Sequence, residues 1–315
     1  MAGQIKAHLI DTIRSEAIKD ISTLQQAFGY EITKHNIPDV WNETQGEGVV
    51  VAILDTGIQQ SPEHEDLVGS VVRVHGDVQD GDGHGSHVAG TISANNNDKG
   101  IVGVAPLSEL AIYKVLGDDG SGTLQGVIDG IDQAVADGCD IINMSLGAPV
   151  SHPDFHDAIK RAYNAGVVVI CAAGNSGDVG ELIYPAAYPE SISVGAIDDQ
   201  NVRAWFSQTG PNLDFVAPGV AILSTIPTNS YAAFQGTCLP SDVMIYTDCG
   251  PKSISKLNRG DKVYSFNEHT EEIELKRVEK RWSNGKKQVR KISLSHSEIR
   301  CTGNHPILVL SDDRQ

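Results

Sequence analysis

Three polar side chains stand where apolar runs of the sequence end or where a helical pattern begins. Asp55 directly follows the apolar run 49–54, His84 opens a segment with helical spacing, and Asn175 follows another apolar run. Carboxylate and imidazole groups hold and transfer protons, and a side-chain amide can donate to a developing negative charge. Cys238 adds a thiol, which is a nucleophile. These residue types predict acid–base and nucleophilic chemistry.

The apolar runs predict the sheet that would position these residues. Five runs are apolar nearly throughout, and segments with helical spacing lie between some of them. The runs are 49–54, 111–115, 140–144, 167–172 and 191–195, and the helical segments are 124–137 and 155–165. Such strands are typical of a parallel sheet that is covered on both faces. We therefore expect an α/β fold, a doubly wound parallel sheet with its chemistry at the carboxyl ends of the strands.

The motifs around these residues resemble those of the subtilisin-like serine proteases, and of their intracellular type. They are Asp55-Thr56-Gly57, His84-Gly85-Ser86-His87, Gly103-Val104-Ala105-Pro106, Asn143-Met144-Ser145-Leu146-Gly147, Ala172-Ala173-Gly174-Asn175 and Val216-Ala217-Pro218-Gly219. The resemblance covers nearly all of residues 35–237. It implies that His84 is the general base, that Asp55 orients its imidazole, and that Asn175 donates to the oxyanion.

The same resemblance implies a substrate site and a calcium site. An extended peptide or protein substrate would pair with two backbone segments, formed by Gly120, Ser121 and Gly122 and by Ser145, Leu146 and Gly147. The calcium ligands would be the Asp66 carboxylate, the Asn97 side chain, and the carbonyls of Asn95, Lys99 and Ile101. The resemblance also implies a cis peptide bond between Tyr184 and Pro185.

The chain departs from this family at the position of the catalytic serine. Gln235-Gly236-Thr237 matches the residues before that serine, although Gln235 stands where the family usually has asparagine. The next residue is Cys238, and no serine-bearing helix follows it. The residues as written therefore cannot complete an Asp–His–Ser triad.

The residues after this point resemble the first half of an intein. Cys238-Leu239-Pro240-Ser241-Asp242 matches an intein start, and Thr302-Gly303-Asn304-His305 matches its Thr-x-x-His block. The resemblance implies that Cys238 accepts the upstream acyl group, that His305 protonates the leaving amide nitrogen, and that Thr302 helps hold the carbonyl. The second half of an intein is missing. We therefore expect the N-terminal partner of a split intein, although a fragment cut at an arbitrary point would look the same.

These patterns predict three regions. Residues 1–36 form an N-terminal helical extension, because apolar residues recur at three- and four-residue steps from Ile5 to Leu24. Residues 37–237 form the N-terminal part of the peptidase domain, and residues 238–315 form a partial all-β Hint domain. Residues 1–237 hold 10 Lys+Arg against 30 Asp+Glu, whereas residues 238–315 hold 14 against 11. The charge therefore changes sign at the same boundary.

Several functions fit this arrangement. The main hypothesis is an N-terminal precursor of a serine endopeptidase, which is inactive alone and undergoes trans-splicing with a partner chain that carries the C-intein and the catalytic serine. The alternatives are a self-contained hydrolase with Cys238 as its nucleophile, a Hedgehog-type self-cleaving protein, and an inactive protease-like binding module. Intact mass and peptide hydrolysis of the isolated chain would separate most of them.

Composition excludes some partners. The net charge of −17 and the 5% aromatic content leave no basic stripe for nucleic acid. No apolar segment is long enough to span a bilayer, and charged residues interrupt residues 1–20, so we expect a cytoplasmic protein. Five cysteines at irregular spacing do not predict a disulfide framework, and Cys139 and Cys171 lie in apolar runs that are expected to be buried.

Overall fold

The computed structural model describes most of residues 26–236 and short strands elsewhere. The described residues are 6–9, 13–14, 26–60, 62–177, 179–180, 182–236, 244–247, 250–253, 262–267, 272–277, 289–293 and 298–302. The chain divides into two compact units, Met1–Cys238 and Leu239–Gln315. Each unit is described below by itself.

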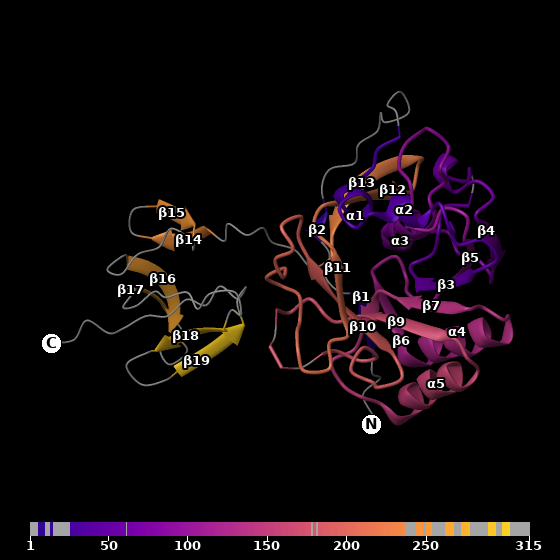
Figure 1. The fold of residues 1–315 in the computed structure, drawn as a ribbon. Helices are drawn as coiled ribbons and strands as arrows, with labels where there is room; N and C mark the ends of the chain where they lie inside the picture. The colour runs from indigo at the N-terminus through magenta and orange to yellow at the C-terminus, as the bar shows by residue number, and fades with distance from the viewer. Residues whose placement is uncertain are drawn as a thin grey trace. The chain divides into compact units, whose positions relative to one another are not determined.

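A seven-stranded sheet in which every pair of neighbours is parallel forms the centre of the first unit (Figure 1). Its strand order is β11-β10-β9-β7-β3-β5-β4. The strands are β3 (Val50–Asp55), β4 (Val71–Val74), β5 (Glu109–Lys114), β7 (Ile141–Met144), β9 (Val168–Ala172), β10 (Ile192–Ile197) and β11 (Phe215–Pro218). The structure therefore confirms the expected α/β fold with a mostly parallel sheet.

Three helices pack on the two faces of this sheet. Successive side chains of a strand point to opposite faces, so Ile53 packs in the cluster of α3 (His84–Ser93) and Leu54 packs in the cluster of α4 (Leu124–Ala136) and α5 (Pro153–Asn164). Figure 1 shows α4 and α5 together, away from α3. Both faces of the central strands are thereby buried.

Short elements complete the first unit. They are α1 (Tyr30–Thr33), α2 (Ile37–Val40), the 3-10 helix Glu65–Leu67, β6 (Ser121–Thr123), β8 (Leu146–Gly147), and the antiparallel pair β12 (Ile222–Ile226) and β13 (Ser230–Gln235). The peptide bond between Tyr184 and Pro185 is cis, as the resemblance implied.

The N-terminal region contains two strands where the sequence predicted a helix. Lys6–Leu9 is strand β1 and Ile13–Arg14 is strand β2. β1 pairs with β6 and β8, and β2 pairs with β13. The free edges of folded strands offer hydrogen-bond partners to an extended segment, and this tertiary pairing overrides a weak local helix preference. The prediction of a helix is therefore wrong for these residues.

The described residues of the second unit are all in antiparallel strands. β14 (Met244–Thr247), β15 (Gly250–Ser253), β16 (Lys262–Asn267) and β17 (Glu272–Arg277) form one sheet, and β18 (Val289–Ser293) pairs with β19 (Glu298–Thr302). In Figure 1 these are the orange-to-yellow arrows from β14 onwards.

Candidate active site

The structure brings Asp55 and His84 together at one end of the parallel sheet. Asp55 is the last residue of β3, and His84 is the first residue of α3. The Nδ1–H of His84 donates to Oδ1 of Asp55 at 2.8 Å, and the backbone N–H of Thr56 donates to the same oxygen at 2.7 Å. The Asp55 side chain is fully buried, whereas the His84 side chain keeps 10% of its exposure. This hydrogen bond fixes the imidazole through Nδ1, so proton exchange with a hydroxyl group would take place at Nε2.

Two glycines allow the turn after β3 to approach the first turn of α3. A Cβ on Gly85 would lie 2.2 Å from the carbonyl oxygen of Gly57, which no side chain tolerates. Gly57 has a φ of 111°, and a Cβ there would lie 2.2 Å from the carbonyl oxygen of Val78. The glycines of the Asp55 and His84 motifs are therefore required for the short distance between the two side chains.

Asn175 lies in the loop that follows β9, so it also stands beyond the carboxyl end of a sheet strand. The preceding Gly174 has a φ of 119°, and its carbonyl accepts from the backbone N–H of Gln208 at 2.8 Å. This left-handed turn points the chain away from the strand and gives Asn175 a half-buried position. Asp55 therefore ends a strand of the sheet, Asn175 follows another strand, and His84 begins the helix whose first turn lies against Asp55.

The two predicted substrate-binding segments flank strand β1. Ser121 and Gly122 belong to β6, Leu146 and Gly147 belong to β8, and β1 lies between these two strands in the order β6-β1-β8. Ala7 is opposite Gly122, and His8 is opposite both Ser121 and Gly147. Gly120 precedes β6 with a φ of 71°, and Ser145 precedes β8. An extended chain therefore fits between the two segments, and in this structure the chain's own N-terminal strand occupies that position.

The predicted calcium loop surrounds the buried carboxylate of Asp66. Its Oδ2 accepts from the backbone N–H of Ile101 and from the hydroxyl of Tyr231, both at 2.9 Å, and its Oδ1 lies 3.5 Å from Nδ2 of Asn97. Burial raises the pKa of Asp66 and of Tyr231. The Asp66 carboxylate thus contacts Asn97 and Ile101 of the 95–101 loop.

Sequence reasoning missed one side chain at this loop. Nε2 of Gln26 donates to the carbonyls of Asn95 and Ile101, at 2.7 and 2.8 Å. These are two of the predicted ligand carbonyls, and they converge on one amide group. A 180° rotation of the Gln26 amide would turn its oxygen toward them, and three such oxygens suit a hard cation. The residues present therefore fit calcium, and a glutamine 69 residues from Asn95 gave no local signal of this role.

The structure describes only one of the three predicted intein residues. Thr302 is the last residue of β19, whereas Cys238 and His305 lie outside the described residues. Two cysteines that the sequence predicted to be buried, Cys139 and Cys171, are both buried. Burial raises the pKa of each thiol, which suppresses the reactive thiolate.

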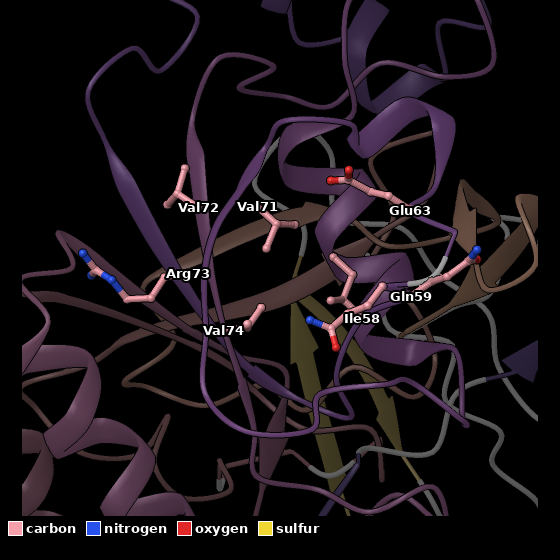
Figure 2. A pocket seen from close by; sticks show the side chains of 8 residues that line it. Ile58, Gln59, Glu63, Val71, Val72, Arg73 and Val74 are labelled. Atoms are coloured by element: carbon pink, nitrogen blue, oxygen red, sulfur yellow. The ribbon is translucent and has the colours of Figure 1, made fainter.

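A small pocket of about 230 Å³ lies beside the edge strand β4 (Figure 2). It is lined by Ile58, Gln59, Gln60, Glu63, Val71, Val72, Arg73 and Val74. Figure 2 shows Glu63 and Arg73 on opposite sides of it. None of the residues predicted to be catalytic or substrate-binding lines this pocket, so it does not belong to the candidate active site.

One face of the sheet is less covered than the other beyond β3. Val169 of β9 is 1% exposed and packs with the α4 and α5 cluster, whereas Val168, on the opposite face, is 42% exposed. Paired residues in parallel strands share a face. Strand pairing therefore places six apolar side chains of β7, β9, β10 and β11, Val168 among them, on the same face, and each of them is half-buried or exposed. They are Ile141, Val168, Ile170, Ile192, Val194 and Phe215. An apolar stripe thus continues on the α3 side without full cover from the described residues.

Comparison with known proteins agrees with this geometry. The chain is 46% identical over 216 residues to an intracellular serine protease of Paenibacillus polymyxa, covering 64% of this chain and 66% of the relative. It is 43% identical over 223 residues to an alkaline protease of Shouchella clausii (70% and 58% covered), and 41% identical over 255 residues to the major intracellular serine protease of Bacillus subtilis strain 168 (76% and 77%). The chain therefore spans less than two thirds of the first two of these relatives.

The match to a protein family covers the sheet and the candidate site. Residues 46–239 match the subtilase family of peptidases, Peptidase S8. This range contains Asp55, His84, Asn175 and both segments that flank β1. The chain belongs to the subtilase family.

Proposed function

We propose that this chain is the N-terminal precursor of a serine endopeptidase whose catalytic serine is supplied by a second polypeptide through trans-splicing. The observation that carries the peptidase part is the buried 2.8 Å hydrogen bond between Asp55 and His84 at the carboxyl end of the sheet. This arrangement prepares an imidazole to take a proton from a hydroxyl group. Membership in a family of serine peptidases supports a serine as the source of that hydroxyl, and we place this serine directly after Thr237.

The partly exposed apolar stripe supports the proposal that a further helix packs on the sheet. Val168 and Phe215 are 42% and 62% exposed, although both belong to strands of the central sheet. Exposed apolar faces of this kind mark surfaces that another element covers. We infer that the serine-bearing helix of the partner packs on this stripe, next to α3. The same step would bring the serine toward His84 and bury the apolar side chains.

The splicing part rests on the sequence after Thr237. The thiol of Cys238 would attack the carbonyl of Thr237, which forms a thioester and frees the amine of Cys238, with Thr302 holding the carbonyl and His305 donating the proton. The hydroxyl of the partner's serine would then attack the thioester. The asparagine at the end of the C-intein cyclises and cleaves the bond to that serine, whose free amine takes over the acyl group and restores an amide.

Intact mass spectrometry of the isolated chain tests this proposal. Incubation with dithiothreitol should release residues 1–237, because an external thiol can capture the thioester at Cys238. The variant Cys238→Ala should remain intact. Release without any added thiol would favour Hedgehog-type self-cleavage, and peptide hydrolysis by the isolated chain would favour a cysteine hydrolase. A wild-type chain that stays intact with the thiol and does not ligate to the partner would contradict trans-splicing.

The pairing of β1 supports a proposal for the class of substrate. β6 and β8 each hydrogen-bond to a strand that lies between them. Backbone pairing of this kind recognises any extended peptide and leaves selectivity to side-chain pockets. We infer that peptide or protein substrates bind in place of β1, so residues 6–9 must leave this position before hydrolysis.

We also propose calcium as a structural cofactor. Asp66, Asn97, Gln26 and the carbonyls of Asn95, Lys99 and Ile101 would hold it, and the ion would supply charge neutralisation for the buried carboxylate. Calcium at a hundred times its dissociation constant should add about 2.7 kcal/mol to the free energy of unfolding. Thermal melting with calcium and with chelator measures this, and equal midpoints would contradict the site. Asp98→Asn should keep the response, whereas Asp66→Asn should lose it.

The location proposed for the protein is the cytoplasm. In the part of the chain that the structure describes, no helix is both long and apolar enough to cross a membrane. Two of the relatives are named as intracellular proteases. Cell fractionation with an antibody against residues 26–236 would test this location.

A further inference from the structure

A second buried aspartate, Asp80, connects the two segments that carry the catalytic pair. It lies four residues before His84 and is 2% exposed. Its oxygens accept five hydrogen bonds. Oδ1 accepts from Thr56 Oγ1 at 2.9 Å, Gly83 N at 2.8 Å and Asp82 N at 3.1 Å, and Oδ2 accepts from Ser86 N at 2.9 Å and Ser86 Oγ at 2.7 Å. Every one of these partners is a donor, so both oxygens must act as acceptors.

Thr56 links this carboxylate to Asp55. Its hydroxyl donates to Asp80 and accepts from the backbone N–H of Gly85 at 2.9 Å, while its own backbone N–H donates to Asp55. Its carbonyl also accepts from Nζ of Lys114 at 2.6 Å. Thr56 is therefore held by four hydrogen bonds, and one of these is made with Asp80.

Asp80 also caps the helix that begins with His84. The N-cap residue of α3 is Gly83, which has a φ of 98° and no side chain with which to cap. Asp80 instead accepts from the N–H of Gly83 and from that of Ser86 in the first turn. A negative charge at this end also interacts favourably with the helix dipole. Asp80 therefore fixes the end of α3 that carries His84.

We propose that Asp80 is a positioning residue for the Asp55–His84 pair. The Asp80 carboxylate binds both the turn that follows Asp55 and the end of the helix that starts with His84. It therefore determines the distance and orientation of the His84 imidazole relative to the Asp55 oxygen. An asparagine at position 80 would place an NH₂ group opposite N–H or O–H donors. The hydrogen bonds that one of the two carboxylate oxygens accepts would therefore be lost. This inference deepens the proposed function, because it assigns a role in hydrolysis to a residue that touches neither substrate nor nucleophile.

Asp198 offers a matched control. It is 1% exposed, and its Oδ1 accepts from the backbone N–H groups of Gln200 and Val202, both at 2.8 Å. It lies in the loop after β10, so it shapes a turn without joining the segments that carry Asp55 and His84. Asp80→Asn and Asp198→Asn therefore both disturb a buried carboxylate, but only the first should move the pair.

The first measurement uses the chain as it exists. The proton on Nδ1 of His84, shared with Asp55, should give a downfield ¹H resonance, which is identified by its loss in His84→Gln. We expect Asp80→Asn to shift or remove this resonance and Asp198→Asn to leave it in place, with urea unfolding showing that both variants fold. An unchanged resonance in folded Asp80→Asn would overturn the inference. This result does not depend on splicing, so it separates a failure of the inference from a failure of the proposed function.

The second measurement uses the ligated peptidase. Small misplacement of a catalytic group can lower turnover about 100-fold, so Asp80→Asn should reduce kcat by about this factor with little change in KM. Asp198→Asn should keep kcat within about twofold. Thr56→Ser, which keeps the hydroxyl, should retain kcat, whereas Thr56→Val should lower it. Equal kcat values for Asp80→Asn and Asp198→Asn at a temperature where both are folded would refute a positioning role.

Discussion

Strands β3 and β9 of the central sheet differ in how their faces are covered. In β3, the neighbouring side chains Ile53 and Leu54 point to opposite faces and are both 0% exposed. In β9, Val169 is 1% exposed but its neighbour Val168 is 42% exposed. The strand that ends at Asp55 is therefore packed on both faces, whereas β9 has one apolar face with incomplete cover from the described residues.

This difference indicates that the Asp55–His84 pair forms independently of the proposed serine nucleophile. The contacts of Asp55 with His84 and Thr56 are made entirely within residues 50–86, which α3 and β3 hold in place. The exposed stripe lies on β7, β9, β10 and β11, where the serine-bearing helix is proposed to pack. A precursor of this kind can fold, hold its catalytic pair and still lack peptidase activity.

Asp55→Asn should separate catalysis from ligation most strongly. Loss of the orienting carboxylate leaves the imidazole in the wrong tautomer, and the comparable change in a serine protease lowers kcat about 10⁴-fold. Ligation should be unchanged, because Asp55 takes no part in the chemistry at Cys238. Peptidase assays and gel analysis of the same reaction measure both. A parallel loss of ligation would show that the two sites are not independent.

Deletion of residues 1–9 should raise the activity of the ligated peptidase. β1 pairs with β6 and β8, where the substrate is proposed to bind, and a tethered strand competes at a millimolar effective concentration. We expect about a 10-fold higher initial rate at substrate concentrations well below that value. Steady-state kinetics over a range of substrate concentrations would test this, and an identical KM for both forms would show that β1 does not compete.

Val168→Ala and Val169→Ala should lower the free energy of unfolding by different amounts, because the two side chains lie on opposite faces of β9. The loss of a buried Val169 side chain should lower the free energy of unfolding by about 2 kcal/mol, whereas the change at Val168 should cost less than about 0.5 kcal/mol. Urea unfolding of the isolated chain measures both values. In the ligated product the cost at Val168 should rise toward that at Val169, and no increase would mean that the partner leaves this face open.

Cys139 and Cys171 should resist alkylation in the folded chain. Burial raises the pKa of both thiols, so the reactive thiolate is scarce at neutral pH. Peptide mapping after brief treatment with iodoacetamide should find both unlabelled, and labelled once the chain is unfolded in guanidinium. Rapid labelling of Cys171 in the native chain would contradict the packing of β9.

The parallel sheet and the proximity of Asp55 to His84 could be predicted because their signals in the sequence are local. The apolar run 49–54 ends at Asp55, and the glycines of the Asp55 and His84 motifs follow at once. The roles proposed for Gln26, Asp80 and residues 6–9 depend on contacts between residues far apart in the sequence or on tertiary strand pairing. The Gln26 amide donates to the carbonyl of Asn95, which is 69 residues away in the sequence. Residues 6–9 are extended because they pair with β6 and β8. No periodicity in the sequence reports such partners.

The most direct test of the central claim is to mix this chain with a partner that carries the C-intein, a serine directly after it and the rest of the peptidase domain. The account predicts a ligated product that joins Thr237 to that serine, and peptidase activity that rises in proportion to this product. Cys238→Ala should give neither the product nor the activity. Activity in the isolated chain, or a ligated product that folds but has no activity, would contradict the account.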